Sequence, residues 1–456
     1  MTNTLMRTDV GALPLPPKNP LSYRERLLAA RAFDSGPETL RDAGGPVTRS
    51  VLGPRQLVPP LVFVTSPQGA HDVLGRTDAL ADRGEVPLAK EFRRLLGGNL
   101  LVLPHDEWLP RRRALQPMFT KQHVPRFAGH MAEAAEQVCR GWGDDDVDLD
   151  WHCRSLTLRA LGRSVLGLDL DQRADAVGPP LRTALGWLTD RSSRPVRAPR
   201  WLPTPAQRRA RAANRALHEL AEEILDNCRA DPTVDAPLVR ALIEATDPRT
   251  GLPLSDGEIC DELVLFMLAG HDTTSTTITY ALWALGHHRE LQDRVFVEVA
   301  ELGDRPLTTD DVARLGFTVQ VLHEALRLCP PASSMSRMVM RDIEVDGFQV
   351  TAGTLAVIGV YAMHRDPALW DDPLEFDPDR FSPQQAKGRS RWQYLPFGGG
   401  PRSCIGDHFA MLEATLALAT IVRQVDIHSL GGDFATEVPF TAVAAGPIWA
   451  RVRQRI

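Results

Sequence analysis

Lysine is scarce in this sequence of 456 residues, and so is net charge. Almost all of the 52 basic residues are arginine, and the formal net charge is only −6. A chain without an excess of basic charge lacks the electrostatic signature of a nucleic-acid-binding protein. We interpret the preference for arginine as a coding bias. The lysines are Lys18, Lys90, Lys121 and Lys387.

Paired cysteines are also missing. The six cysteines are scattered, and none forms the C-x-x-C pair or the paired spacing that indicates a zinc site. We therefore expect a reducing compartment, in which five of the six are small buried residues. The sixth, Cys404, has different surroundings. The other five are Cys139, Cys153, Cys228, Cys260 and Cys329.

No apolar run reaches the length of about 18 residues that a membrane-spanning helix needs. Residues 1–20 are polar and proline-rich and lack the apolar region of a secretory signal. We therefore predict a cytoplasmic, monomeric protein without a transmembrane anchor. Nothing repeats, and no linker-like run divides the chain. The predicted organisation is an N-terminal arm over 1–20 and a single domain over 21–456.

The spacing of apolar residues predicts a mainly α-helical fold with a small β region. The clearest helix begins at Ser255, where Ser255 and Glu258 form an S-x-x-E capping box, and extends to about residue 285. Thr308 and Asp311 form a weaker cap. Other helices are expected at 67–74 and 207–229, within a helical region at 108–247, and from just after Gly406 to about 420. Strands are expected over 45–64 and in an antiparallel unit at 342–360, and irregular chain at 190–205 and 369–400.

The most informative segment is Phe-Gly-Gly-Gly-Pro-Arg-Ser-Cys-Ile-Gly at 397–406. Its three successive glycines allow the backbone to turn tightly and to approach a flat ligand. Cys404 comes just before a predicted helix start, so helix amides and the helix dipole are expected to stabilise a thiolate. Arg402 adds positive charge that could also pair with a carboxylate of the ligand. Such a sulfur is suited to bind ferric heme. The alternative is a buried cysteine in a glycine-rich turn.

This segment resembles the heme-binding signature F-x-x-G-x-R-x-C-x-G of the cytochrome P-450 superfamily, and matches it at Phe397, Gly400, Arg402, Cys404 and Gly406. The resemblance, to soluble bacterial members, spans about residue 46 to the C-terminus. It implies the single-domain P-450 fold, with heme b between the distal helix at 255–285 and the proximal cysteine loop and helix. It also implies that Cys404 is the thiolate ligand of the iron. Residues expected to contact the heme here are Phe397, Gly398, Arg402 and Gly406.

The distal helix carries a second motif, Ala-Gly-His-Asp-Thr-Thr at 269–274, which resembles the oxygen-activation motif of the family. Cleavage of an O–O bond needs two protons, and a hydroxyl beside a carboxylate can deliver them through water. Thr273 is expected to face the heme while Asp272 reaches sideways to solvent. The resemblance implies that both are catalytic, and that Ala269 and Gly270 lie against the heme, with Gly270 leaving room for dioxygen. The alternative is a threonine-rich helix whose hydroxyls bond back to carbonyls.

Two further motifs occur in the order that the family shows. Glu324 and Arg327 form E-x-x-R and can pair on one helix face. Pro-Asp-Arg-Phe at 378–381 supplies Arg380, and Asp379 stands where glutamate is common in the family. The resemblance implies that Glu324, Arg327 and Arg380 form a structural triad that holds the cysteine loop in place.

Trp108 and Arg112 form W-x-x-x-R, which in the family contacts the heme propionates, and Arg337 matches another propionate ligand. Arginine suits this role because it forms charge-assisted hydrogen bonds with carboxylates. Pro110 lies inside the motif and is tolerable only in the first turn of a helix. We interpret Arg111 and Arg113 as part of a solvated basic face.

The substrate pocket is expected to be largely apolar, because Leu265, Phe266 and Ala269 share a helix face with Thr273. Segment 79–104 is expected to cover the heme, and residues near 181–201 to form a lid. The amino-acid sequences of the motifs resemble those of family members that act on fatty acids and terpenes. The full set of expected substrate contacts is Phe92, Leu96, Leu265, Phe266, Ala269 and Ala332.

The resemblance implies a monooxygenase that inserts one atom of O2 into an apolar small molecule of secondary metabolism. No flavin or iron–sulfur segment follows the heme domain, so NAD(P)H-derived electrons are expected through a ferredoxin and a ferredoxin reductase. A basic docking surface could include Arg111, Arg113, Lys387, Arg389 and Arg391. The alternatives are a heme-thiolate isomerase, dehydratase or peroxide-driven oxygenase, and a non-catalytic heme-binding protein.

Overall fold

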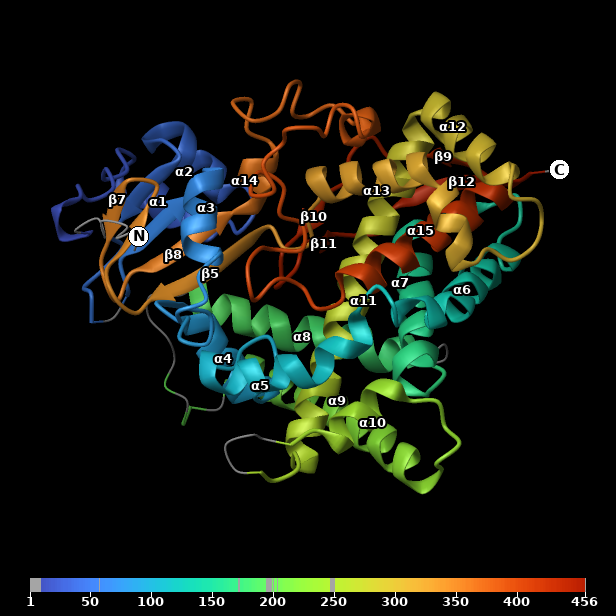
Figure 1. The fold of residues 1–456 in the computed structure, drawn as a ribbon, viewed down its shortest axis with the longest axis horizontal. Helices are drawn as coiled ribbons and strands as arrows, with labels where there is room; N and C mark the ends of the chain where they lie inside the picture. Colours follow the sequence, from blue (N-terminus) through green and yellow to red (C-terminus); the bar gives the residue numbers. More distant parts are fainter. Residues whose placement is uncertain are drawn as a thin grey trace, which may run out of the picture.

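The fold is described from a computed structural model, which covers residues 10–455 apart from 57, 171–172, 194–198, 200, 203 and 247–250 (Figure 1). Helices dominate it, as predicted. The α-helices are α1 Tyr23–Ala29, α2 Gly36–Gly44, α3 Pro67–Leu74, α4 Pro87–Leu96, α5 His105–Leu115, α6 Ala128–Arg140, α7 Leu149–Leu161, α8 Ala174–Ser193, α9 Pro205–Ala230, α10 Pro237–Glu244, α11 Asp256–His287, α12 Arg289–Ala300, α13 Gly316–Leu328, α14 Val360–His364 and α15 Asp407–Gln424.

Short helical turns and strands complete the fold. The 3-10 helices are η1 Val10–Ala12, η2 Gln116–Phe119, η3 Val124–Phe127, η6 Thr309–Arg314 and η7 Pro378–Phe381, and a π-helical turn, η4, covers Gly162–Leu166. The strands are β1 Val47–Ser50, β2 Leu61–Val64, β3 Ala81–Asp82, β4 Asp146–Asp148, β5 Ser334–Val339, β6 Ile343–Val345, β7 Phe348–Val350, β8 Leu355–Gly359, β9 Val425–Ser429, β10 Thr436–Glu437, β11 Val443–Ala444 and β12 Trp449–Gln454.

The largest sheet has the strand order β1-β2-β8-β5-β3. β2 is parallel to β8, with Val62 opposite Ala356, and the other pairs are antiparallel. All four residues of β2 are buried, which is typical of a strand that is covered on both faces. Figure 1 shows this sheet with α1, α2 and α3 at one end of the molecule, and most of the other helices at the opposite end.

The antiparallel unit expected at 342–360 is only partly observed. β6 and β7 form a hairpin whose turn residues, Asp346 and Gly347, both have positive φ, 49° and 80°. Such a turn matches the twist of the flanking strands. β8 does not join this hairpin. It pairs with β2 and β5, because its apolar residues are buried in the large sheet.

The long helix α11 crosses the middle of the molecule (Figure 1). Its start is the predicted capping box, in which the Ser255 hydroxyl accepts from the Glu258 amide and the Glu258 carboxylate accepts from the Ser255 amide. α11 packs against α7, α9, α13 and α15, so it is buried on most of its surface. The middle of α11 therefore faces the interior on several sides. None of the helices in the described ranges is both long and apolar enough to cross a membrane.

Two local predictions were wrong. Helix α8 extends to Ser193 and so includes the start of the loop expected at 190–205; of the remainder, 194–198, 200 and 203 lie outside the described residues. Pro110 is the sixth residue of α5 and not in its first turn, because the helix already begins at His105. A proline there has no amide hydrogen for the carbonyl of Asp106.

Candidate active site

A largely apolar cavity of about 370 Å³ lies between the middle of α11 and the loop that precedes α15. It brings together residues that the sequence places far apart. The predicted site residues in its wall are Phe92, Trp108, Arg112, Leu265, Phe266, Ala269, Gly270, Thr273, Ala332, Arg337, Phe397, Gly398, Arg402, Cys404 and Gly406. Asp272 and Leu96 are not part of the wall; both side chains are buried elsewhere.

Cys404 faces this cavity from the proximal loop. Its amide donates to the Phe397 carbonyl at 2.8 Å, which closes the loop directly before α15. Burial raises the pKa of the Cys404 thiol, whereas the amide of Gly406 and the charges of Arg112 and Arg83 act to lower it. The expected stabilisation by the helix start is present, but burial outweighs it. A bonded cation would hold this sulfur as a thiolate.

The glycines of the loop are explained by protein contacts. Gly398 and Gly400 have φ of 74° and 72°, a region that L side chains rarely adopt. A Cβ on Gly400 would lie 2.0 Å from the Leu74 carbonyl oxygen, and one on Gly399 would overlap the ring of Trp392. Close approach to a flat ligand is therefore not what requires Gly399 and Gly400. Their small size lets the loop pack against α3 and Trp392.

The predicted arginines converge on the cavity. Arg112 donates to the Ser403 carbonyl at 2.9 Å, and Arg337 donates only to the carbonyl of its neighbour Ser336 within the described chain. Arg402 lies 3.1 Å from Asp82 and stacks over Trp108, with 4.5 Å between the guanidinium carbon and the ring centroid. Arg402 thus pairs with a protein carboxylate and not with Cys404.

Sequence reasoning missed a fourth arginine, Arg83, which directly follows β3 and lines the same cavity. No side-chain hydrogen bond or ion pair involves Arg83 in the part of the chain that the structure describes. Burial lowers the pKa of Arg83 to about 10, of Arg402 to about 10 and of Arg337 to about 9. Within the described chain, Asp82 and Cys404 are the only acidic groups that raise the pKa values of these three arginines. This excess of buried positive charge fits a ligand with carboxylates, as heme is.

The distal motif differs in part from expectation. Asp272 does not reach solvent: it is 1% exposed, and its carboxylate lies 2.6 Å from Arg154 of α7. Thr273 lines the cavity, and its hydroxyl donates to the Ala269 carbonyl at 2.6 Å, so it both faces the site and bonds back to its helix. A Cβ on Gly270 would lie 2.8 Å from a methyl group of Leu161. Glycine at this position therefore allows α7 to pack closely on α11.

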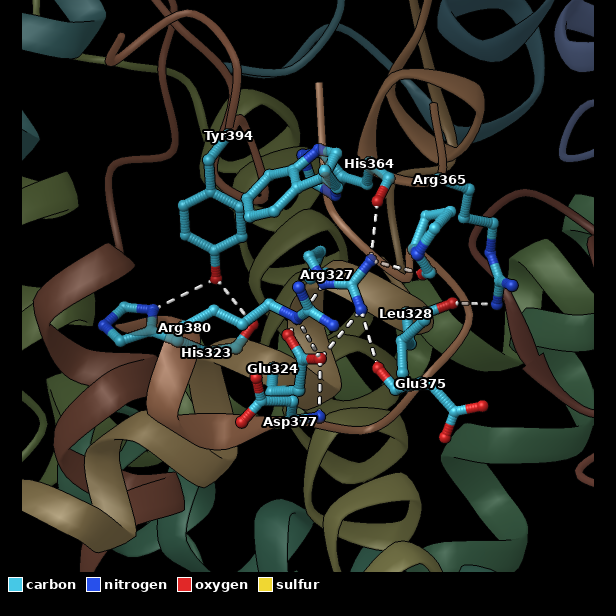
Figure 2. A network of polar contacts seen from close by, with 12 residues as sticks. His323, Glu324, Arg327, Leu328, His364, Arg365, Glu375, Asp377, Arg380 and Tyr394 are labelled. Atoms are coloured by element: carbon cyan, nitrogen blue, oxygen red, sulfur yellow. Dashed lines mark hydrogen bonds and ion pairs between the residues drawn. The ribbon is translucent and has the colours of Figure 1, made fainter. Parts of the chain in front are cut away.

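Glu324, Arg327 and Arg380 form the expected cluster (Figure 2), and none of them is part of the cavity wall. The Glu324 carboxylate lies 2.7 Å from Arg327 and 3.1 Å from Arg380, and Arg327 and Glu324 are fully buried. The two guanidinium groups also donate to the carbonyl of His364 at the end of α14 and to carbonyls of the irregular segment before η7, at Pro373, Glu375, Asp371 and Asp372. The cluster thus connects α13 to the irregular chain that leads toward the cysteine loop.

The apolar wall agrees with the predicted face of α11, since Leu265, Phe266 and Ala269 all line the cavity. Phe266 stacks on Phe119, with ring centroids 5.4 Å apart. No sequence motif indicates the contribution of the segment between β10 and β11, where Phe440 meets Phe92 at a distance of 5.7 Å between ring centroids. Short strands near the end of a chain have too little pattern to be placed.

The prediction that Arg111 and Arg113 lie on a solvated basic face is wrong for Arg111, whereas Arg113 is exposed. Arg111 is buried and bonds to Glu262 at 2.9 Å and to Glu258 at 3.2 Å. Its charge is therefore neutralised inside the protein, and Arg111 cannot be part of a docking surface. Arg389 is half-buried, donates to the Arg380 carbonyl and stacks over Trp370.

A family model for cytochrome P-450 matches residues 16–434, and the chain belongs to this family. Cyclooctatin synthase of Streptomyces melanosporofaciens is 32% identical over 413 residues, which are 89% of this chain and 88% of that protein. Pentalenene oxygenase of Streptomyces avermitilis is 31% identical over 385 residues, 84% of each. A cyanobacterial cytochrome P-450 with bound retinoic acid superposes with a TM-score of 0.83 at 24% identity, over 97% of this chain and all of that one. The fold and these relatives define the enzyme as a cytochrome P-450 monooxygenase.

Proposed function

We propose that this enzyme hydroxylates a compact, apolar terpenoid that occupies the Thr273 side of the cavity, with heme bound on the Cys404 side. The observation that carries the proposal is the wall itself, in which aromatic and aliphatic side chains surround the space between the distal helix and the cysteine. An apolar cavity of this kind favours a ligand that buries hydrocarbon surface. The relatives cyclooctatin synthase and pentalenene oxygenase favour a cyclic terpenoid over a fatty acid.

Heme b fits the residues of this site. Cys404 would supply the sulfur ligand of the iron, and Arg83, Arg112 and Arg337 would hold the propionates together with Trp108 and Arg402. Phe397, Gly398, Gly406, Ala269 and Gly270 would contact the ring. When bound, heme with a thiolate ligand supplies the dioxygen activation, since the sulfur donates electrons that favour O–O cleavage. The protein residues bind, orient and supply protons.

The residues proposed to guide protons lie on α11. Thr273 orders water in the cavity, and its hydroxyl oxygen is free to accept because its hydrogen is directed at the Ala269 carbonyl. Asp272 is not part of the cavity wall, and its carboxylate is fixed by the ion pair with Arg154. We therefore assign Asp272 to a step of the relay behind Thr273, which reaches the site through water.

Electrons are proposed to come from NAD(P)H through a ferredoxin and its reductase. The candidate docking surface is reduced to the exposed residues Arg113, Lys387 and Arg391, since Arg111 is buried and Arg389 is half-buried. A basic surface would attract an acidic partner and accelerate association at low salt. To test this step, turnover is measured at rising ionic strength. We expect turnover to fall, and a change in the substrate should not restore it.

The decisive experiment is substrate titration of the purified holoenzyme. Pentalenene and related cyclic terpenoids are expected to shift the ferric spin state, whereas fatty acids of similar mass are not. The reduced carbon-monoxide spectrum checks thiolate ligation and is expected to change in C404A. Turnover with NADPH, ferredoxin and reductase, and not with peroxide alone, separates a monooxygenase from the peroxide-driven, isomerase and non-catalytic alternatives. A fatty acid that shifts the spin state when every terpenoid fails would contradict the proposal.

A further inference from the structure

Glu413 is a buried carboxyl group that the proposed mechanism does not use. It lies on α15, is 1% exposed, and neither of its oxygens has a hydrogen-bond partner of normal geometry among the described residues. A charged carboxylate in such surroundings costs several kcal/mol. Burial accordingly raises the pKa of Glu413 well above its usual range, opposed only by the hydroxyl of Thr274. Burial therefore favours the protonated form of Glu413.

Thr274 differs from the other hydroxyl residues around it on α11. The side chains of Thr273, Ser275, Thr276, Thr277 and Thr279 each donate to a carbonyl of their own helix, at 2.6–3.1 Å. No such bond is made by Thr274 within the described chain. Thr274 lies on the helix that packs against α15 and acts to lower the pKa of Glu413, and the residue forms part of the cavity wall next to Thr273. Thr274 thus lies between the buried acid and the proposed reaction site.

We propose that Glu413 is a positioning residue, a permanently protonated acid that donates to the Thr274 hydroxyl and so turns the hydroxyl hydrogen of Thr274 toward the cavity. The inference rests on the proposed function for its consequence in turnover. For the hydrogen bond it rests on the burial of Glu413, on the lack of another partner for its carboxyl oxygens in the described chain, and on the packing of α11 against α15. Cys404 lies in the loop directly before α15, so this helix and its preceding loop would position groups on both sides of the site.

The two neighbouring threonines then have complementary roles. Thr273 directs its hydrogen at the Ala269 carbonyl and presents an oxygen that accepts. Thr274 accepts from Glu413 and presents a hydrogen that donates, because a hydroxyl has one donor and two acceptor positions. A water between them can be held by one bond of each kind. Ordered water of this kind is what proton delivery to a bound oxygen requires.

Glu413 acts as a hydrogen-bond donor and not as a proton source. Release of its proton would leave a charge in the contact between α11 and α15, with no cation of the described chain near enough to lower the pKa. The Thr274 proton can move only if Glu413 replaces it, and that step would create the same charge. Conservative replacement by an uncharged donor should therefore preserve function.

Three variants of the holoenzyme test the proposal: E413Q keeps a donor, E413L removes it, and T274V removes its acceptor. In infrared difference spectra between H2O and D2O, the wild type is expected to show the C=O stretch of a protonated carboxylic acid. This band should be absent in E413Q and E413L and should move to higher frequency in T274V. Peroxide released per NADPH consumed, with pentalenene as the probe, should rise about threefold to tenfold in E413L and T274V and stay within about twofold in E413Q.

T420V is the matched control. Thr420 is a fully buried residue of the same helix whose hydroxyl also lacks a partner in the described chain, but it is not part of the cavity wall. It should change neither the band nor the peroxide yield. Absence of the carboxylic-acid band, or E413Q and E413L behaving alike in peroxide yield, overturns the proposal. If E413L fails to fold, the band shift and the peroxide yield of T274V test the proposal. The infrared result does not depend on any substrate, so it stands even if pentalenene and every other terpenoid fail to bind.

Discussion

The guanidinium of Arg154 lies 2.6 Å from the carboxylate of Asp272, and both side chains are buried at the contact between α7 and α11. Arg154 also binds Asp150, one turn earlier on α7, at 2.7 Å. Asp272 is therefore held in place by a neighbouring helix and is not free to move between the cavity and solvent. Disruption of the pair should affect both stability and proton delivery.

We expect R154M to destabilise the enzyme by about 3–5 kcal/mol, because it leaves the buried Asp272 carboxylate uncompensated. The double variant R154M/D272N should recover most of this loss, since the remaining amide carries no charge. Urea denaturation of the four proteins in a double-mutant cycle measures the coupling. A loss below about 1 kcal/mol in R154M would show that water or another group neutralises Asp272.

The Glu324–Arg327 pair offers a second stability test. E324Q removes the only carboxylate of a cluster that contains the fully buried Arg327, and we expect a loss of about 3–5 kcal/mol. The matched control is R294M, which breaks the exposed pair between Arg294 and Asp379 at 2.7 Å and should cost below about 1 kcal/mol. Thermal and chemical denaturation measure both variants. Equal losses in the two would contradict the structural role of the cluster.

Arg83 and Arg337 should retain the cofactor. Each charge-assisted hydrogen bond to a propionate is worth about 1.5–3 kcal/mol, so R83M and R337M should release heme about 10 to 100 times faster. Transfer of heme to an excess of apomyoglobin measures the rate. R113M, on an exposed arginine of α5, is the control and should leave the rate unchanged. Rates within twofold of wild type in both variants would exclude these arginines from the heme contacts.

His218 of α9 connects three elements of the structure. It lies 3.0 Å from Asp261 of α11, whose second oxygen accepts the amide of Gly98 in the segment after α4. The hydrogen bond to Asp261 raises the pKa of His218 above its usual value, with burial acting in the opposite direction. A Cβ on Gly97 would overlap the Asp261 carboxylate, so this contact requires glycine.

A raised pKa in the folded state means that His218 contributes stability in its protonated form. This contribution is fully present below about pH 6.5, the value in the unfolded chain, and is lost as the pH rises through the folded pKa. The stability difference between wild type and H218Q should therefore be larger at pH 5.5 than at pH 8. Denaturation over a pH series measures it, and D261N should abolish the pH dependence. An unchanged difference across the series would rule out the ion pair.

Local signals predicted the parts of the fold that depend on neighbouring residues. The capping box of Ser255 and Glu258, the start of α15 after Gly406 and helix α3 all follow from short-range rules, and the structure has them. The face of α11 that lines the cavity follows from helical periodicity, because Thr273 fixes which side is inward.

Contacts between segments that are far apart in the sequence could not be predicted. Arg111 and Arg113 belong to one run of three arginines, and the position of Glu262, about 150 residues later, explains why Arg111 is buried while Arg113 is exposed. Arg154, which pairs with Asp272, and Arg83, which follows β3, do not belong to any sequence motif. Pairing across a fold depends on three-dimensional packing, which periodicity does not specify.

The strand order has a consequence for synthesis of the chain. β2 needs β8, about 290 residues later, and β4 pairs with β12 at the C-terminus, with Val147 opposite Ala450. Loops of this length close slowly, so neither sheet can form until the ribosome has released most of the polypeptide. The wall of the cavity includes Phe440, which lies between β10 and β11, so we expect cofactor capture only after this late segment has been synthesised.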